Sequence, residues 1–328
     1  MSDTLPIQDM THLLVVILNY RTAQLTIDCL ESLGPEVRAL PGTQVIVTDN
    51  SSQDGSVEQI GAAIQAARWE DWVSLQPLPS NGGFAMGNNA AIRLALQSPN
   101  PPAYFLLLNP DTIVHPGALS ELVQFMDHHP KAGIVGSRLE NPDGSPQHSA
   151  FRFPSIFSEL DHGLRFGLAT QLLKRWEVTP PISEEICQTD WLSGASILIR
   201  KEVFEAVGLL DEQYFMYYEE LDFCLKAYKS GWYCWYVPQS RVIHLVGQSS
   251  GVNNSAKRRP QYWFESRRRY FLKNHGWVYT AIADATWLIS FIIRRLRLII
   301  QRQPDTEPPF LLTDFWTNSI FLKGRQLK

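Results

Sequence analysis

Short apolar runs alternate with amphipathic stretches between Leu13 and Asp111, and this alternation restricts the possible folds more than any other feature of the chain. The first run, LLVVILNY, is too short and too rich in valine and isoleucine for a helix, which favours a buried strand. Similar runs are TQVIVTD, WVSLQPL and AYFLLLNPD, and the stretches between them place apolar residues at helical spacing. Strands that alternate with helices predict an α/β fold, with a mostly parallel sheet flanked by helices.

Four polar segments coincide with the ends of these strands: LNY at 18–20, TDNSS at 48–52, NGGFAMGNN at 81–89 and NPD at 109–111. Ligands of α/β proteins bind at the carboxyl ends of the strands, so we expect the four segments to meet there. The two glycines of NGG precede a predicted helix, which suits close backbone approach to a charged ligand. The chain has no G-x-x-x-x-G-K-[ST], and no G-x-G-x-x-G follows the first strand, so P-loop and dinucleotide sites lose their main support.

Two acidic residues at strand ends each have two explanations. The NPD segment of Asp111 is typical of a turn, but a carboxylate at the end of a buried strand also suits a metal site. A Mg²⁺ or Mn²⁺ ion on a nucleotide diphosphate needs only one or two protein carboxylates. Asp49 belongs to the segment DNSS, whose residues favour a turn and the N-cap of the following helix. Its carboxylate is equally placed to accept a hydrogen bond from the N–H of a pyrimidine base.

The segment YYEELDFCLK holds three acids in four positions, Glu219, Glu220 and Asp222. Acids at an exposed helix N-terminus suit the helix dipole, which is the simpler explanation. The segment also follows the aromatic stretch FMYY, so at least one acid is expected to be enclosed, where it is able to act as a general base. His244, in RVIHLVG, is either a core histidine or a neutral metal ligand.

Six segments occur together in an order that resembles the family 2 inverting glycosyltransferases with a GT-A fold, and most closely their rhamnosyltransferase-like branch. The resemblance covers roughly residues 12–275, and the six segments are VVILNYRTAQLTIDCLESL, VIVTDNSSQDGS, NGGFAMGNNAAI, LLLNPDTIV, the long stretch from WLSGASILIR to LKAYKSGW, and VIHLVGQSS. It implies transfer of a rhamnose-like sugar from a dTDP- or UDP-sugar to a hydroxyl of a growing, lipid-linked cell-surface glycan.

The resemblance also implies roles for individual residues in binding the nucleotide sugar. Asp49 matches the acid that contacts the uracil or thymine ring, and Asn19 and Tyr20 match residues of the same pocket. The residues that match the loop against the nucleotide and the donor sugar are Asn81, Gly82, Gly83, Phe84 and Asn88. The residues that match the strand lining the donor and acceptor pocket are Trp191, Gly194 and Ala195.

The metal site and the base follow from the resemblance too, with two departures from the family pattern. Asn109 and Asp111 occupy the D-x-D position, where Asn109 replaces the first aspartate and leaves Asp111 as the carboxylate for Mg²⁺ or Mn²⁺. His244 matches a histidine that completes the metal and diphosphate site. Glu220 stands where the family has the aspartate base; we favour it over Asp222.

Charge divides the chain into two parts. Residues 1–255 hold 15 lysines and arginines against 28 acids, a net charge of −13, whereas residues 256–302 hold 11 against 2, a net charge of +9. We therefore expect a GT-A catalytic domain at 1–255 and a basic helical extension at 256–328.

The extension is expected to bind a membrane surface. Its apolar run TAIADATWLISFII is 14 residues long and contains Asp284, too short to span a bilayer. An apolar stripe flanked by arginines is typical of a helix lying in the interface, which predicts peripheral attachment of residues 256–302 to the cytoplasmic face of the membrane near a polyprenyl-diphosphate-linked acceptor. Aromatic residues beside the arginines favour lipid over nucleic acid. The alternative is that the helix packs on the catalytic domain or in a homodimer.

Four scattered cysteines without a C-x-x-C pair argue against a zinc site or a disulfide framework and fit a reducing cytosol. The N-terminal segment MSDTLPIQDM lacks the features of a signal peptide. Two rival functions are a sugar-nucleotide pyrophosphorylase, which needs a basic glycine-rich loop that LNYRTAQ lacks, and a catalytically silent sugar-nucleotide-binding scaffold on the membrane.

Overall fold

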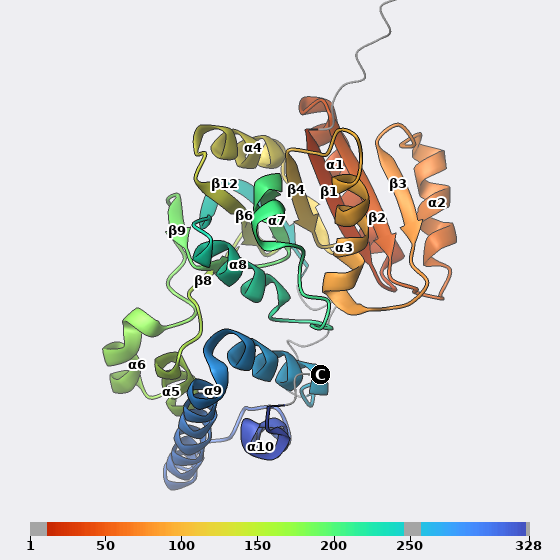
Figure 1. Ribbon diagram of the computed structural model, residues 1–328. Coiled ribbons are helices and arrows are strands. Elements are labelled where there is room, and N and C mark those ends of the chain that lie inside the picture. The colour runs from red at the N-terminus through yellow and green to blue at the C-terminus, as the bar shows by residue number, and fades with distance from the viewer. Residues whose placement is uncertain (1–11, 246–256, 326–328) are drawn as a thin grey trace, which may run out of the picture.

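The computed structural model describes residues 12–245 and 257–325 (Figure 1). The N-terminal segment MSDTLPIQDM and the end of the motif VIHLVGQSS lie outside the described residues. The strands are β1 (Leu13–Asn19), β2 (Thr43–Asp49), β3 (Val73–Pro77), β4 (Tyr104–Leu108), β5 (Thr112–Val114), β6 (Ala132–Glu140), β7 (Pro146–Gln147), β8 (Ala150–Phe151), β9 (Cys187–Thr189), β10 (Trp191–Leu192), β11 (Ser196–Arg200) and β12 (Tyr233–His244).

The central sheet has the strand order β3-β2-β1-β4-β11-β6-β12-β5, with β7 paired to β6 and β9 paired to β12. The four strands from β3 to β4 are parallel, as the alternation predicted. Strand β11 runs antiparallel to both of its neighbours, and β6 and β12 are parallel to each other. A separate pair joins β8 to β10.

Helices cover both faces of this sheet. The helices are α1 (Ala23–Ala39), α2 (Ser56–Ala67), α3 (Gly83–Leu96), α4 (Ala118–His128), α5 (Ile156–Leu164), α6 (Gly167–Leu173), the 3₁₀ turn η1 (Lys174–Trp176), α7 (Lys201–Val207), α8 (Glu219–Lys229), α9 (Gln261–Ile300), α10 (Leu311–Asn318) and α11 (Ile320–Lys323). Strand β1 shows why both faces must be covered, because Leu13, Val15 and Ile17 enter the core under α1, α2 and α4, whereas Leu14 and Val16 enter the core under α3, α7 and α8.

The register of the sheet brings the polar strand ends together. Asn19 of β1 pairs with Asp49 of β2. The backbone N–H of Asn109, just after β4, donates to the carbonyl of Ala195 at 3.0 Å. Strand β12 ends with His244 opposite Thr112, which follows the NPD segment. The expectation that these segments share one edge of the sheet is therefore confirmed.

A third layer of helices lies below the sheet domain in Figure 1 and consists of α5, α6, α9, α10 and α11. Helix α5 packs along α9, so this layer uses residues from both sides of position 255. Helix α9 is broken at Gly276, whose φ of 78° and ψ of 175° are not helical. Trp287 stacks on Phe315 of α10 with ring centroids 3.9 Å apart, which fixes the second half of α9 to the end of the chain.

The arginine run RRR of α9 is buried, which corrects the expectation that its charges face an anionic partner. Arg267 lies 2.6 Å from both Glu159 and Asp284, and Arg269 lies 2.7 Å from Asp211. Buried charges need such partners, since desolvation would otherwise oppose folding. Much of the positive charge at 256–302 therefore neutralises acids of this same chain.

Helix α9 leaves an apolar surface uncovered on its second half. The exposed apolar residues there, which we call the α9 stripe, are Ile282, Ile289, Ile292, Ile293, Leu296, Ile299 and Ile300. In the described ranges α9 is the single helix long and apolar enough to cross a membrane, by length and composition alone, and 39% of its most apolar window is buried in the protein. One face of α9 thus packs against the rest of the protein, while the α9 stripe is exposed at the surface.

Candidate active site

A cavity of about 430 Å³ opens at the carboxyl edge of the sheet, and we call it the strand-end cavity. It brings together many of the residues singled out from the sequence. Those that line it are Tyr20, Asn81, Gly83, Phe84, Asn109, Gly194, Ala195, Glu220 and His244.

Asn19 and Asp49 do not line this cavity. Both are buried, and the Asn19 side-chain amide donates to Asp49 at 2.6 Å. The Ser52 hydroxyl and backbone amide also donate to the Asp49 carboxylate, at 2.6 and 2.9 Å. Asp49 therefore holds the loop after β2 in place, and its contact with a pyrimidine base stays a prediction.

The glycine turn before α3 meets the protein's own backbone. A Cβ atom on Gly83 would lie 1.8 Å from the carbonyl oxygen of Phe215, and Gly83 has a φ of 85°. The amide of Phe84 donates to the same carbonyl at 2.9 Å, which ties the turn to the aromatic loop before α8. Gly83 is thus needed for the close approach of this turn to Phe215, and the approach of the turn to a charged ligand stays a prediction. Gly82 does not line the cavity, and buried Asn88 donates to the carbonyl of Phe84.

Asp111 and His244 form a compact pair at the ends of neighbouring strands. His244 Nε2 lies 3.5 Å from Asp111 Oδ1 and 3.5 Å from Asn109 Nδ2. Within residues 12–245 and 257–325, no three His, Cys, Asp or Glu side chains gather as a metal cluster. A cation bound to a nucleotide diphosphate needs only one or two protein ligands, and a carboxylate beside an imidazole suits Mn²⁺ better than Mg²⁺, which prefers oxygen ligands. The pair therefore fits such a cation by its chemistry.

Glu220 stands at the start of α8, beside the cavity. The two residues before the helix, Tyr217 and Tyr218, have φ values of 69° and 70°, a left-handed conformation that is costly for non-glycine residues and often occurs at functional sites. Glu220 Oε2 is buried and accepts no hydrogen bond in the described structure. Burial raises the pKa of Glu220 to about 7, although hydrogen bonds to its carboxyl from the backbone of Glu220, Gly194 and Leu221 oppose the shift.

Glu219 lines the same cavity, and sequence reasoning assigned it no role in the site. Burial raises its pKa well above the usual range, and the charge of Glu220 next to it adds to the shift. Two neighbouring carboxyls in a desolvated site do not ionise together easily, so Glu219 is expected to stay protonated while Glu220 ionises.

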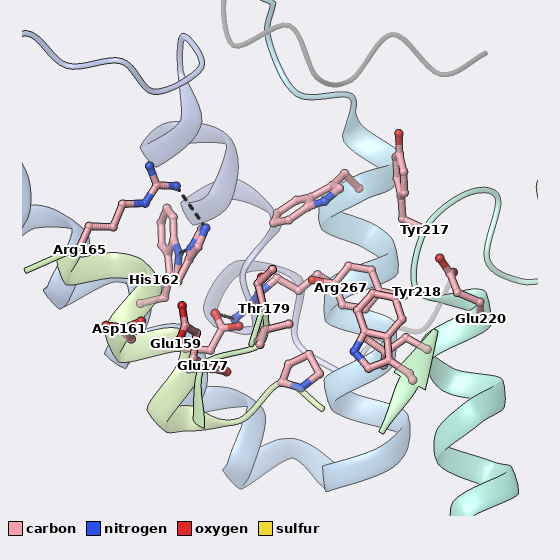
Figure 2. Close-up of a pocket in the computed structure, with 17 residues that line it drawn as sticks. Glu159, Asp161, His162, Arg165, Glu177, Thr179, Tyr217, Tyr218, Glu220 and Arg267 are labelled. Carbon is pink, nitrogen blue, oxygen red and sulfur yellow. Dashed lines mark hydrogen bonds and ion pairs between the residues drawn. The ribbon is translucent and has the colours of Figure 1, made fainter. Parts of the chain in front are cut away.

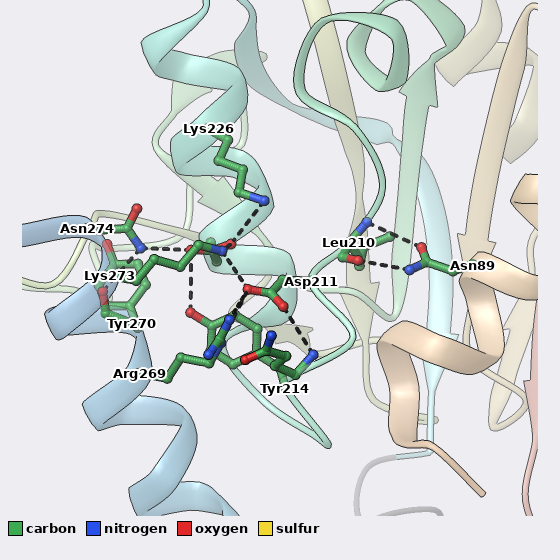
Figure 3. Close-up of polar contacts among 11 residues, drawn as sticks. Asn89, Leu210, Asp211, Tyr214, Lys226, Arg269, Tyr270, Lys273 and Asn274 are labelled. Carbon is green, nitrogen blue, oxygen red and sulfur yellow. Dashed lines mark hydrogen bonds and ion pairs between the residues drawn. The ribbon is translucent and has the colours of Figure 1, made fainter. Parts of the chain in front are cut away.

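Asp222 does not line the strand-end cavity, and its side chain contacts α9 instead. Its carboxylate is fully buried and accepts hydrogen bonds from Lys273 and Asn274, each at 2.7 Å, while Lys226 lies 3.6 Å away. Lys273 also pairs with Asp211 at 2.6 Å, as Figure 3 shows, and so joins the two acids. Of the two acids considered as the base, geometry therefore favours Glu220.

We expect Asp222→Asn to weaken the fold rather than the chemistry. The change removes a buried charge that faces Lys273, although Lys273 keeps Asp211 as a partner, so the free energy of unfolding should fall by roughly 2–3 kcal/mol, somewhat less than for a fully broken buried pair. Urea unfolding followed by circular dichroism measures the loss, and transfer is assayed at a temperature where the variant is folded. A variant with normal unfolding and no transfer would contradict this role.

A second cavity of about 450 Å³ lies between the sheet domain and the helical layer, and we call it the helical cavity (Figure 2). Trp191 lines this cavity and not the strand-end cavity. The helical cavity is bounded by α5, by both halves of α9 and by the start of α8. Tyr217 and Glu220 line both cavities. Glu220 therefore stands between them.

Helix α9 contributes to the strand-end cavity, which no pattern in the sequence indicated. Tyr262 lines this cavity, with its ring centroid 5.5 Å from that of Phe215 and 6.1 Å from that of Tyr217. A tyrosine at the start of a helix assigned to a separate extension has no pattern that places it in an active site. Only the folded chain brings it there.

The fold matches solved glycosyltransferases. The mannosyltransferase PcManGT of Pyrobaculum calidifontis, solved with GDP-Man and Mn²⁺, superposes with a TM-score of 0.51 and 14% identity over 94% of this chain and 69% of that one. Residues 1–349 of TarS from S. aureus give a TM-score of 0.52 and 14% identity over 94% and 81%. Together with the mixed sheet, these likenesses define the GT-A fold.

Sequence comparison then gives the family. The sequence model described as glycosyl transferase family 2 matches residues 14–175, and that of glycosyl transferase family group 2 matches residues 104–304. The N-acetylglucosaminyl-diphospho-decaprenol L-rhamnosyltransferase of Mycobacterium tuberculosis is 31% identical over 221 residues, covering 63% of this chain and 68% of the relative. The dTDP-rhamnosyl transferase RfbF of Shigella flexneri is 26% identical over 71% of this chain and 73% of the relative. The chain belongs to glycosyltransferase family 2, in its rhamnosyltransferase-like branch.

Proposed function

We propose that this chain transfers a rhamnose-like sugar from a dTDP- or UDP-sugar to a hydroxyl of a polyprenyl-diphosphate-linked glycan, with inversion. The names of the mycobacterial and Shigella relatives support the donor, and that of the mycobacterial relative supports the acceptor. The observation that carries the proposal is the position of Glu220, whose carboxyl borders both the strand-end cavity and the helical cavity.

This position suits a single displacement with a different reactant on each side of the base. Glu220, ionised, takes the proton from an acceptor hydroxyl as that oxygen attacks the anomeric carbon. The bond from the anomeric carbon to the diphosphate oxygen breaks on the opposite face, through an oxocarbenium-like transition state. A carboxyl with a pKa of about 7 is matched to this task, since it is partly ionised at neutral pH and still basic enough to accept a proton.

His244, which lines the strand-end cavity, and buried Asp111 beside it would hold a divalent cation for the diphosphate. When bound, a Mg²⁺ or Mn²⁺ ion stabilises the negative charge of the leaving diphosphate as a Lewis acid. The chain's own residues orient the rest of the donor: Phe84 and Tyr20 give apolar walls and Asn81 offers amide hydrogen bonds. The net charge of −13 over residues 1–255 makes a counter-ion for the nucleotide diphosphate important.

Donor and acceptor are tested together. Calorimetry with dTDP- and UDP-sugars, each with and without Mn²⁺, should single out a rhamnose-type donor whose binding requires the metal. Mass spectrometry should then show transfer to an N-acetylglucosaminyl diphosphate prenol, and NMR should show the anomeric configuration inverted. Turnover of a different sugar nucleotide, with none of the deoxyhexose donors used, would overturn the donor assignment.

The membrane part of the proposal depends on the α9 stripe. We infer peripheral attachment at the cytoplasmic face, since an exposed apolar helix face beside a site for a lipid-linked acceptor suits insertion into the bilayer interface. A variant with Ile289, Ile293, Leu296 and Ile300 changed to glutamine should float with liposomes several-fold less than the wild type while keeping its melting temperature. Leu94→Gln, on an exposed apolar side chain of α3, is the matched control. Equal flotation of all three proteins would refute the attachment.

A further inference from the structure

The residues that line the helical cavity indicate the class of ligand that it suits. Its walls are rich in aromatic rings, contributed by Trp191 of β10, by Trp263 and Trp287 of α9, and by the tyrosine pair 217–218. Figure 2 shows Glu220 on one side of this space, with Glu159, Asp161 and Glu177 on the other. Aromatic walls with a few converging polar groups are typical of pockets for small organic ligands.

The cations of this cavity are already neutralised by the protein. Among the described lining residues the arginines are Arg165, which lies 2.6 Å from Glu307, and Arg267, which lies 2.6 Å from Glu159. Burial, together with the charge of Arg165, lowers the pKa of His162 to about 4, so this ring is neutral at pH 7. A phosphate or diphosphate would find no uncommitted positive charge here.

Some hydrogen-bond acceptors of the helical cavity, in contrast, have no donor among the described contacts. Among the described contacts the Glu177 carboxylate makes no hydrogen bond or ion pair, and the hydroxyl of Thr179 beside it makes none either; both line the cavity. Glu220 Oε2 is buried without a partner at the other end. Carboxylates accept hydrogen bonds from hydroxyl groups and repel anions, so this set of groups suits a neutral, hydroxylated ligand.

We propose that the helical cavity is the acceptor subsite and that it takes an uncharged pyranose ring, which packs against the aromatic walls and donates hydroxyl hydrogen bonds to Glu177. The acceptor's diphosphate stays outside the cavity. This inference rests on the proposed function, in that Glu220 receives the proton from a hydroxyl of the ring. It gives the helical layer a part in the reaction, because α5 and α9 both contribute residues to the wall.

The test compares Glu177→Gln and Thr179→Val, singly and together, with Glu185→Gln. Glu185 is a matched control because it is an exposed glutamate of the same connecting segment and lies outside the cavity. With the full chain, the double variant should raise KM for the glycan acceptor at least fivefold, while KM for the donor nucleotide sugar stays within twofold. Glu185→Gln should leave both unchanged. An acceptor KM within twofold of wild type in the double variant would overturn the inference.

Direct binding separates this inference from the proposed function. Saturation-transfer NMR with methyl N-acetylglucosaminide should show ring protons in contact with the wild type and with Glu185→Gln, and a several-fold weaker signal with the double variant. Geranyl diphosphate, which has no sugar, should not displace the glycoside. Absence of the signal in the wild type, or its displacement by geranyl diphosphate, would refute the subsite. Glycoside binding without transfer from any donor would instead contradict the proposed function.

Discussion

Glu220→Gln should lower kcat by roughly 10²–10⁴-fold, the range for loss of a general base, while the affinity for the donor nucleotide sugar stays within twofold. Glutamine keeps the size of the side chain and can still accept a hydrogen bond, but it cannot take up the proton of the acceptor hydroxyl. Steady-state kinetics measures kcat, and calorimetry with the donor measures its affinity. Normal turnover by this variant would exclude Glu220 as the base.

The pH dependence of the same pair of proteins provides a control. Because the pKa of Glu220 in the folded protein is about 7, kcat/KM of the wild type should rise with pH through about 7, and the residual activity of Glu220→Gln should not. Stability should move the other way: a raised carboxyl pKa gives full stability below the unfolded value of 4.5, and that stability is lost as pH rises through 7. Glu220→Gln should therefore be more stable than the wild type at pH 8, by as much as roughly 3 kcal/mol, and equal to it near pH 4.

Asp111→Asn should reduce transfer by on the order of 100-fold or more, comparable to losing a main stabiliser of transition-state charge. The amide keeps the shape of the side chain but removes the negative charge beside His244 that would hold the cation. Titration with Mn²⁺ in the presence of the donor should show that the metal no longer tightens donor binding. The backbone carbonyl of Asp111 still accepts from Leu245 at 2.8 Å, so the fold should survive the change.

The matched control for Asp111→Asn is Asp143→Asn, an exposed aspartate in the turn between β6 and β7. Its kinetics and its Mn²⁺ response should equal those of the wild type. If Asp111→Asn retains a normal metal response and near-normal turnover, the assignment of Asp111 and His244 as metal ligands is wrong.

The sheet was predictable because each strand can be recognised from its own short run of residues. A run such as LLVVILN has no amphipathic period and buries both of its faces, which only an internal strand between two helical layers allows. The start of α8 at Glu219 and the meeting of polar segments at one edge follow equally from local patterns plus the geometry of parallel strands. The antiparallel direction of β11 was harder to predict, since the composition of a buried strand does not depend on its direction.

The roles of charged residues were less predictable, because they depend on partners far away in the sequence. Asp222 and Glu220 lie two positions apart in one helix, yet one faces α9 and the other a cavity. The arginine run of α9 suggested an anionic surface, whereas Glu159, one of the acids paired with it, lies more than a hundred residues earlier. Charge counted along a sequence cannot show which charges are neutralised inside the fold.

The sequence by itself therefore determined the α/β architecture, the family and the cluster of polar strand ends, because each is set by short-range periodicity or by motifs in a fixed order. Tertiary structure alone decided three further points: that Glu220 borders two cavities, that Asp222 serves the fold, and that α9 supplies walls to both cavities. The physical reason is the same for each. Burial, and with it the pKa and the available partners of a side chain, depends on contacts between segments that only the folded chain brings together.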